Sequence, residues 1–340
     1  MTSGYTVYGR STSVFQPFRA AYPWIGGDLQ TVKNTLRWLP PTFVSERQER
    51  LVFPMNDGTG DSLSGLLDKP AQDTGLPLLI LVHGLTGCEE SRNIMVSAAH
   101  YVSCGFSVVR LNLRGAGPSV GQCREQYHAG RTQDLAAVLT TMPETLRQNG
   151  VVIVGVSLGG NILLKFASQD AESFGVRAIA SVSAPIDLKA AQQRIMAPRN
   201  FVYHRYLLNR MKTDARALPH DKDATSRALG NVDSVYDYDD LIVAPRNGFD
   251  GAEDYYAKCS AKSILSEINI QTLLIHAKTD PWIPLSMYLD NDWPADGPLT
   301  LIVSEDGGHV GFHGANSPTP WHDRCIGDYF VDLFATGQRV

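Results

Sequence analysis

Short apolar runs separated by longer stretches of helical pattern dominate the chain between residues 78 and 303. Six runs rich in Val, Ile and Leu are too short for helices and are bounded by turn residues, which is typical of strands buried on both faces of a sheet. They occupy residues 78–82, 106–113, 151–154, 176–182, 272–277 and 299–303. Because helical stretches alternate with them, the pattern predicts a mostly parallel, doubly wound α/β sheet.

The amino-terminal part of the chain has a different pattern. Residues 50–55 and 63–67 flank the turn-rich segment 56–61, which predicts an antiparallel hairpin at one edge of the sheet. Residues 1–48 carry prolines between aromatic residues in an irregular pattern, so we expect an arm packed on the domain. A length of 340 residues allows two domains, but this order of elements favours a single α/β domain over 1–340.

One interval, residues 187–245, breaks the alternation, because it has amphipathic segments and no strand signal. It follows the carboxyl end of a strand, where open α/β sheets bind ligands. We therefore interpret it as a helical lid, with Phe201 and Leu207 as candidate pocket residues. The alternative is a pair of helices that only caps the core. The acidic run 236–240 lacks a metal-ligand spacing and is interpreted as a solvated or hydrogen-bonded loop.

The composition limits the expected binding partners and the expected cellular compartment of the protein. Thirty Lys and Arg against 35 Asp and Glu give a net charge of −5, so no basic field favours nucleic acid or an anionic membrane. Five cysteines without a Cys-x-x-Cys pair argue against a disulfide framework and suit a reducing cytoplasm. The first residues lack a signal-peptide core, and no uncharged apolar run approaches the ~18 residues of a membrane span. We expect a cytoplasmic protein without stable membrane insertion, of unspecified oligomeric state.

The segment 151–165 has the pattern of a nucleophile elbow. A short apolar run ends at Gly155-Val156-Ser157-Leu158-Gly159, and a helical period follows. In such an elbow the serine occupies a strained turn between strand and helix, and glycines flank it because side chains would collide with neighbouring backbone. Chance alone would produce Gly-x-Ser-x-Gly roughly 0.1 times in a chain this long. The flanking strand and helix therefore make Ser157 the candidate nucleophile.

A serine nucleophile needs a histidine base and a carboxylate that orients it. In α/β-hydrolases the chain order is Ser, acid, His, each on a loop after a strand. Asp280 follows the run 272–277 and His309 follows the run 299–303, so both fit that order. Asp187, after the run 176–182, is the principal alternative acid, whereas Asp306 is too near His309 in sequence to lie behind its ring.

The remaining polar groups of such a site are also predicted. The oxyanion of the reaction needs N–H donors, which we assign to the backbone of Leu158, directly after the serine, and of Leu85, on the loop after 78–82. His128 precedes a helical stretch and is a candidate to line the pocket.

Two patterns typical of metal or cofactor sites are incomplete in this sequence. His309 and His313 have the i, i+4 spacing of a zinc helix, but the required Glu is absent and four glycines oppose a helix there. Gly115-Ala116-Gly117 is followed by its next glycine at 121, which is the wrong spacing for dinucleotide binding. We expect neither a metal nor a cofactor.

Several motifs together resemble the YheT-like branch of the α/β-hydrolases. They are residues 83–85, 110–115, 155–161, 280–281, 308–312, 248–249 with 254–256, and Gly27-Asp28-Leu29-Gln30-Thr31, in which Asp28 stands where the branch has His. The resemblance covers nearly the whole chain. It implies a serine esterase with Ser157, Asp280 and His309 as the catalytic triad. Members of the branch hydrolyse carboxylic esters, some act on acylglycerols, and some transfer acyl groups to alcohols.

We therefore expect a carboxylesterase that cleaves small neutral esters with short to medium acyl chains through an acyl-enzyme. An acyltransferase that passes the acyl group to an alcohol is the alternative. A non-catalytic ligand-binding protein on a hydrolase scaffold is disfavoured, because no member of the expected triad is missing.

Overall fold

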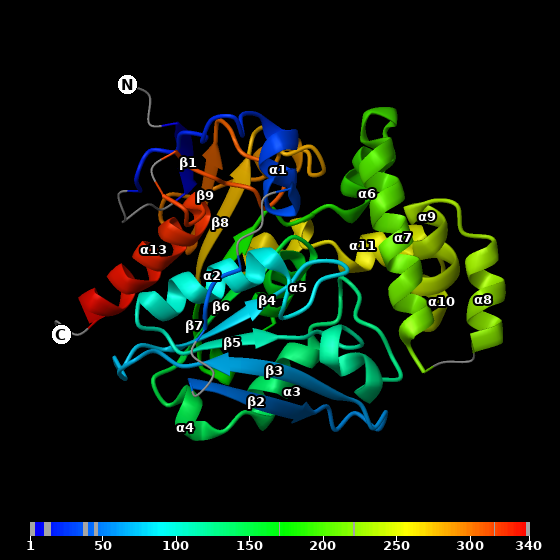
Figure 1. Ribbon diagram of the computed structural model, residues 1–340, viewed down its shortest axis with the longest axis horizontal. Helices are drawn as coiled ribbons and strands as arrows, with labels where there is room; N and C mark the ends of the chain where they lie inside the picture. The colour runs from blue at the N-terminus through cyan, green and yellow to red at the C-terminus, as the bar shows by residue number, and fades with distance from the viewer. Residues whose placement is uncertain are drawn as a thin grey trace.

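The computed structural model describes residues 4–9, 15–36, 40–43, 47–169, 171–219, 222–315 and 317–337. Nine strands form one sheet in the order β1-β9-β8-β7-β6-β4-β5-β3-β2 (Figure 1). The strands are β1 Tyr5–Gly9, β2 Gln48–Pro54, β3 Ser62–Asp68, β4 Leu78–Val82, β5 Val108–Leu111, β6 Val151–Val156, β7 Val176–Val182, β8 Gln271–Ala277 and β9 Leu299–Ser304. The six from β4 to β9 are parallel, which confirms the predicted doubly wound sheet.

Helices fill the connections between the strands. The α-helices are α1 Gly27–Leu36, α2 Arg92–Ser103, α3 Gln133–Thr141, α4 Glu144–Arg147, α5 Leu158–Ala167, α6 Leu188–Met196, α7 Phe201–Ala217, α8 Lys222–Gly230, α9 Val235–Tyr238, α10 Ala244–Arg246, α11 Ala252–Cys259, α12 Ser286–Leu289 and α13 Trp321–Gly337. Short 3₁₀ turns are η2 Gly117–Gln122, η3 Ala171–Phe174, η4 Pro198–Asn200 and η6 Lys262–Glu267, and η5 Asp239–Val243 is a π-helical turn.

The alternation of side chains along the central strands explains the layers of the fold. In β4 every residue is buried: Leu78, Ile80 and Val82 join one hydrophobic cluster, and Leu79 and Leu81 join another. The first cluster includes apolar residues of α3 and α5, and the second includes those of α2 and α13. The sheet is therefore covered by helices on both faces, as Figure 1 shows. Burial on both faces is what the continuous apolar runs predict.

The antiparallel edges of the sheet come from the amino-terminal part of the chain. β2 and β3 pair as the predicted hairpin, and β3 continues the sheet by pairing with β5. Within residues 1–48, the described part of the chain forms two elements that the irregular pattern did not predict. β1 pairs antiparallel with β9 at the opposite edge, and residues 27–36 form α1. Residues Tyr5 to Tyr8 of β1 alternate only weakly in polarity, and α1 has little apolar character, so neither element had a strong sequence signal.

The helices between β7 and β8 form a body of their own beside the sheet. From α6 to α10 no strand occurs among the described residues. Apolar side chains from this segment make a separate hydrophobic cluster that includes Ile195, Leu208, Met211, Leu229 and Ile242. Figure 1 shows α6 to α10 beyond the carboxyl ends of β4 and β5. In the described part of the chain, no helix has the length and apolar character needed to cross a membrane.

Candidate active site

Ser157 lies at a sharp turn between β6 and α5. Its backbone has φ 52° and ψ −125°, a left-handed conformation that costs a non-glycine residue free energy. Hydrogen bonds hold the turn: the Ser157 N–H donates to Val182 O at 2.8 Å, and the Ser157 carbonyl accepts from Gly160 N at 2.9 Å. A Cβ at Gly155 would lie 2.6 Å from the Gly159 carbonyl oxygen, and one at Gly159 would collide with the His83 carbonyl. The crowding explains both glycines of the elbow.

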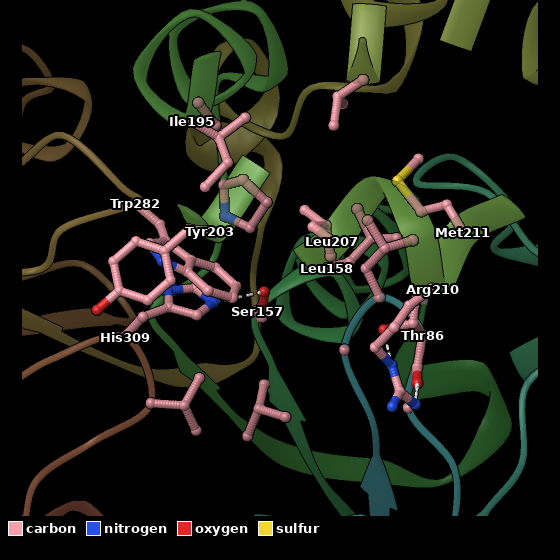
Figure 2. Close-up of a pocket in the computed structure, with 18 of the residues that line it drawn as sticks. Thr86, Ser157, Leu158, Ile195, Tyr203, Leu207, Arg210, Met211, Trp282 and His309 are labelled. Carbon is pink, nitrogen blue, oxygen red and sulfur yellow. Dashed lines mark hydrogen bonds between the residues drawn. The ribbon is translucent and has the colours of Figure 1, made fainter. Parts of the chain in front are cut away.

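Three loops bring Ser157, Asp280 and His309 together, although 152 residues separate the serine from the histidine. His309 Nε2 lies 2.9 Å from Ser157 Oγ, and His309 Nδ1 lies 3.0 Å from Asp280 Oδ2. Figure 2 shows the contact between the serine and the ring. The residues follow β6, β8 and β9, whose carboxyl ends meet at one edge of the parallel sheet. The array can pass a proton from the hydroxyl to the imidazole while the carboxylate holds the ring.

Asp280 is held as an anion inside the protein. The residue is 5% exposed, and its Oδ1 accepts hydrogen bonds from the backbone N–H groups of Trp282 at 2.8 Å and Ile283 at 3.0 Å. Burial by itself raises the pKa of this carboxyl, but the adjacent His309 ring and the hydrogen bonds outweigh burial, so the pKa lies below its ordinary value. Asp280 therefore remains charged at neutral pH opposite the histidine.

The competing acids have other roles in the structure. The Asp187 carboxylate accepts from Ala190 N at 3.0 Å and caps the start of α6. Asp306 accepts from its neighbour Gly307 N at 2.7 Å and from Gly26 N at 3.2 Å. His309 is paired with Asp280 instead, in the arrangement that chain order favoured.

Helix α1 supports the loop that carries His309, and the sequence analysis missed this role. Thr31 Oγ1 accepts from the His309 N–H at 2.8 Å. Gln30 is fully buried and bonds both the N–H and the carbonyl of His313 through its side-chain amide, at 2.6 and 3.1 Å. A Cβ at Gly308 would collide with the Gly27 carbonyl. The Gly-Asp-Leu-Gln-Thr motif was the available signal, since its Gln and Thr are these two partners.

Comparisons with known proteins identify the family of the chain. A family model described as the alpha/beta hydrolase fold matches residues 77–315. The YheT protein of Escherichia coli strain K12 is 32% identical over 291 residues, which cover 83% of this chain and 84% of that protein. The chain belongs to the YheT-like branch of the α/β-hydrolase family. A monoacylglycerol lipase of Saccharomyces cerevisiae is 27% identical over 74% of this chain, which spans only 58% of that enzyme.

The fold of the family is also found among solved structures. The crystal structure of a 2,6-dihydroxy-pseudo-oxynicotine hydrolase is similar with a TM-score of 0.59 at 20% identity. The similarity covers 92% of this chain and 73% of that one. At this identity the likeness concerns the fold alone.

The loop after β4, which carries Leu85, runs beside the serine. A Cβ at Gly84 would lie 3.0 Å from Ser157 Cβ and 3.5 Å from Ser157 Oγ. Leu85 and Leu158 both line the cavity at Ser157. Within the described ranges, neither of their backbone N–H groups has a hydrogen-bond partner. The next residue fixes the loop, because Thr86 N donates to the Tyr127 hydroxyl at 2.7 Å. Two free donors therefore lie near the nucleophile.

A cavity of about 800 Å³ opens above Ser157. Helices α1, α6 and α7 and the loops after β4, β7 and β8 contribute to its walls, and Figure 2 shows Ile195, Leu207, Met211 and Trp282 around the serine. The volume is in the range of small-molecule sites. Two predicted pocket residues, Leu207 and His128, are among the lining residues. Burial, followed by the nearby Arg131 charge, lowers the pKa of His128 to about 4, so the ring is neutral.

The prediction that Phe201 lines this cavity is wrong. Its side chain is 62% exposed and absent from the described lining, and the Arg205 guanidinium lies over its ring, 5.9 Å from the centroid. The reason is helical phase: Tyr203 and Leu207 face the cavity, and Phe201 lies roughly 200° around α7 from Tyr203. Apolar character alone did not distinguish the two faces, because α7 also buries residues in its own cluster.

The acidic run 236–240 is helical, where a loop was expected. Two of its three carboxylates accept backbone hydrogen bonds: Asp237 from Asp233 N and Asp240 from Ala252 N. Asp239 is different, because it is 9% exposed, lines the cavity and accepts from the Tyr256 hydroxyl at 2.7 Å. No group of three His, Cys, Asp or Glu side chains in the described part of the chain is arranged to hold a metal ion.

The buried carboxyl of Asp239 is expected to make the stability of the protein depend on pH. Burial raises its pKa from 3.8 to about 7, so the unfolded chain loses this proton before the folded protein does. The contribution of Asp239 to the free energy of unfolding is therefore greatest below pH 3.8 and declines as pH rises toward 7. We expect Asp239→Asn, which cannot ionise, to raise the free energy of unfolding at pH 8 by up to about 4 kcal/mol, with little gain near pH 4.

Urea unfolding at both pH values measures this difference. Asp296→Asn, at an exposed aspartate, is the matched control and is expected to show no such pH dependence. An equal effect of Asp239→Asn at the two pH values would contradict the assignment of a buried, ionising carboxyl.

Proposed function

We propose that the protein is a serine carboxylesterase that cleaves small neutral esters with short to medium acyl chains. The continuous contact from Ser157 through His309 to Asp280, opening into one cavity, carries this proposal. Membership of the α/β-hydrolase family and the relative named as a lipase support ester hydrolysis. The cavity volume of about 800 Å³ supports a small-molecule substrate, and apolar lining side chains such as Leu207 and Met211 support its neutrality.

The reaction we propose has two halves. Ser157 Oγ attacks the ester carbonyl carbon as its proton moves to His309 Nε2, and Asp280 stabilises the imidazolium that forms. The N–H groups of Leu85 and Leu158 bind the oxyanion of the tetrahedral intermediate. The carbon–oxygen bond to the alcohol then breaks, and the alcohol leaves with the proton from His309. Water repeats the sequence on the acyl-enzyme, and the carboxylic acid is released.

We further propose that the chain is one α/β-hydrolase domain in which residues 187–245 serve as a lid over the cavity. The free state of all five cysteines supports a cytoplasmic location.

An acyltransferase would use the same acyl-enzyme with an alcohol in place of water. Product analysis with added alcohol separates the two, because excess new ester over acid would indicate transfer.

The lid role predicts a change in chain-length preference. Leu207 faces the cavity from α7, so Leu207→Ala lengthens the space above Ser157. We expect the variant to move the best p-nitrophenyl ester toward a longer acyl chain by about two methylene groups, each worth about 0.8 kcal/mol when buried. The measurement is kcat/KM across a series from acetate to dodecanoate.

Phe201→Ala is the matched control for this experiment. It shortens an apolar side chain of the same helix, but this side chain lies outside the cavity. The chain-length profile of the variant should therefore match that of the wild type. Equal profiles for Leu207→Ala and Phe201→Ala would count against a lid that shapes the acyl site.

A further inference from the structure

The indole ring of Trp282 covers one face of the His309 ring. The ring centroids are 4.4 Å apart and the planes differ by 23°, which is a stacked arrangement. Figure 2 shows the two stacked rings next to Ser157. The two nitrogens of His309 lie on its edge and are used by Asp280 and Ser157. The indole therefore contacts the imidazole without competing for either hydrogen bond.

The position of Trp282 is fixed from two sides. Its backbone N–H donates to Oδ1 of Asp280 at 2.8 Å, while Oδ2 of the same carboxylate bonds His309. The Tyr203 ring packs edge-on against the indole at 5.4 Å. Tyr203 is in turn tied to α1, because its hydroxyl donates to Asp28 at 3.0 Å. Helix α1, helix α7 and the loop after β8 thus hold the indole against the histidine.

The indole N–H indicates which part of the side chain matters. Trp282 Nε1 is buried and has no hydrogen-bond partner among the residues that the structure describes. No hydrogen bond of this N–H to the described protein therefore anchors the indole, whose ring face lies on His309.

We propose that Trp282 is a positioning residue that holds the His309 ring in the plane of its hydrogen bonds and stabilises the imidazolium formed in both halves of the reaction. An aromatic face attracts a cation placed over it. The attraction is absent while the ring is neutral and is strongest when the proton has left Ser157, so it lowers the barrier more than it strengthens substrate binding. The proposal rests on the proposed esterase function.

The test compares Trp282→Leu with Trp282→Phe on a neutral ester over a range of pH. Trp282→Leu is expected to lower kcat roughly five- to thirty-fold, with a smaller change in KM. The acid limb of kcat/KM should move to lower pH by about 0.5 to 1 unit, because the protonated ring loses its stabilisation. Trp282→Phe should recover most of kcat. Asp280 and His276, the titratable side chains that interact with His309, are unchanged in both variants.

Trp293→Leu controls for the loss of a tryptophan from the same connection between β8 and β9. It lies outside the described cavity lining and donates its indole N–H to Tyr288 O at 3.0 Å, so it should lower the melting temperature without moving the acid limb. An unmoved limb in Trp282→Leu, or equal losses of kcat in Trp282→Leu and Trp282→Phe, would overturn the proposal.

An NMR titration of His309 separates this proposal from the proposed function, because it requires no turnover. The midpoint in Trp282→Leu is expected to be lower than in the wild type. If the wild-type protein failed to hydrolyse any ester, the proposed function would fall while the titration still decided the role of Trp282. Identical midpoints would refute that role whatever the activity.

Discussion

Ser157→Ala is expected to lower kcat for ester hydrolysis by a factor on the order of 10⁶. The variant keeps the cavity and the free N–H donors of Leu85 and Leu158, so a residual rate above the uncatalysed reaction should remain. KM should change little, because the hydroxyl contributes to bond formation more than to substrate binding. The measurement is steady-state hydrolysis of a p-nitrophenyl ester by purified protein.

Ser168→Ala provides the control for this substitution. Ser168 lies at the other end of α5 and its hydroxyl donates to the Lys165 carbonyl, so the variant should keep full activity. The Ser157 backbone is strained, and a fall in activity could be confused with unfolding, so both variants need the same urea-unfolding measurement. Retention of more than about a thousandth of wild-type kcat by a folded Ser157→Ala protein would contradict the nucleophile assignment.

Asp280→Asn is expected to reduce kcat by about 10⁴. The amide is nearly the same size and still accepts the N–H bonds of Trp282 and Ile283. It lacks the charge that stabilises the imidazolium, and its NH₂ group can select the wrong ring tautomer of His309. The effect therefore appears in kcat at every pH, and raising the pH does not restore it.

Asp187→Asn tests the competing acid directly. Asn also serves as a helix cap, so this variant should retain the start of α6 and nearly all activity. The reverse result, with activity lost in Asp187→Asn and kept in Asp280→Asn, would require a different acid and would contradict the pairing of Asp280 with His309.

The central strands, and the placement of Ser157, Asp280 and His309 at their ends, were predictable from the sequence for a physical reason. Strands buried on both faces must be apolar throughout, so β4 and β6 are readable as continuous runs. The elbow glycines are equally readable, since the backbone approaches too closely for a side chain. Asp280 and His309 followed from chain order, because parallel strands bring their carboxyl ends to one edge.

The parts that were missed depend on contacts between segments distant in the chain. β1 is partly exposed and gains its partner only when β9 is present. Gln30 and Trp282 are polar or half-exposed residues whose partners, His313 and His309, lie in other loops. The orientation of Phe201 depends on the phase of α7 against its own cluster and the cavity. No local sequence pattern predicts these contacts and orientations.

The most direct test of the account is the site of covalent modification by a fluorophosphonate. Such a reagent bonds to a serine oxygen that a neighbouring base activates, so peptide mass spectrometry should locate one adduct, on Ser157. The adduct should be absent from Ser157→Ala and strongly slowed in His309→Ala, and it should abolish ester hydrolysis in proportion to labelling. Labelling of another residue, or full labelling of Ser157 without loss of hydrolysis, would contradict the claim that Ser157 is the nucleophile.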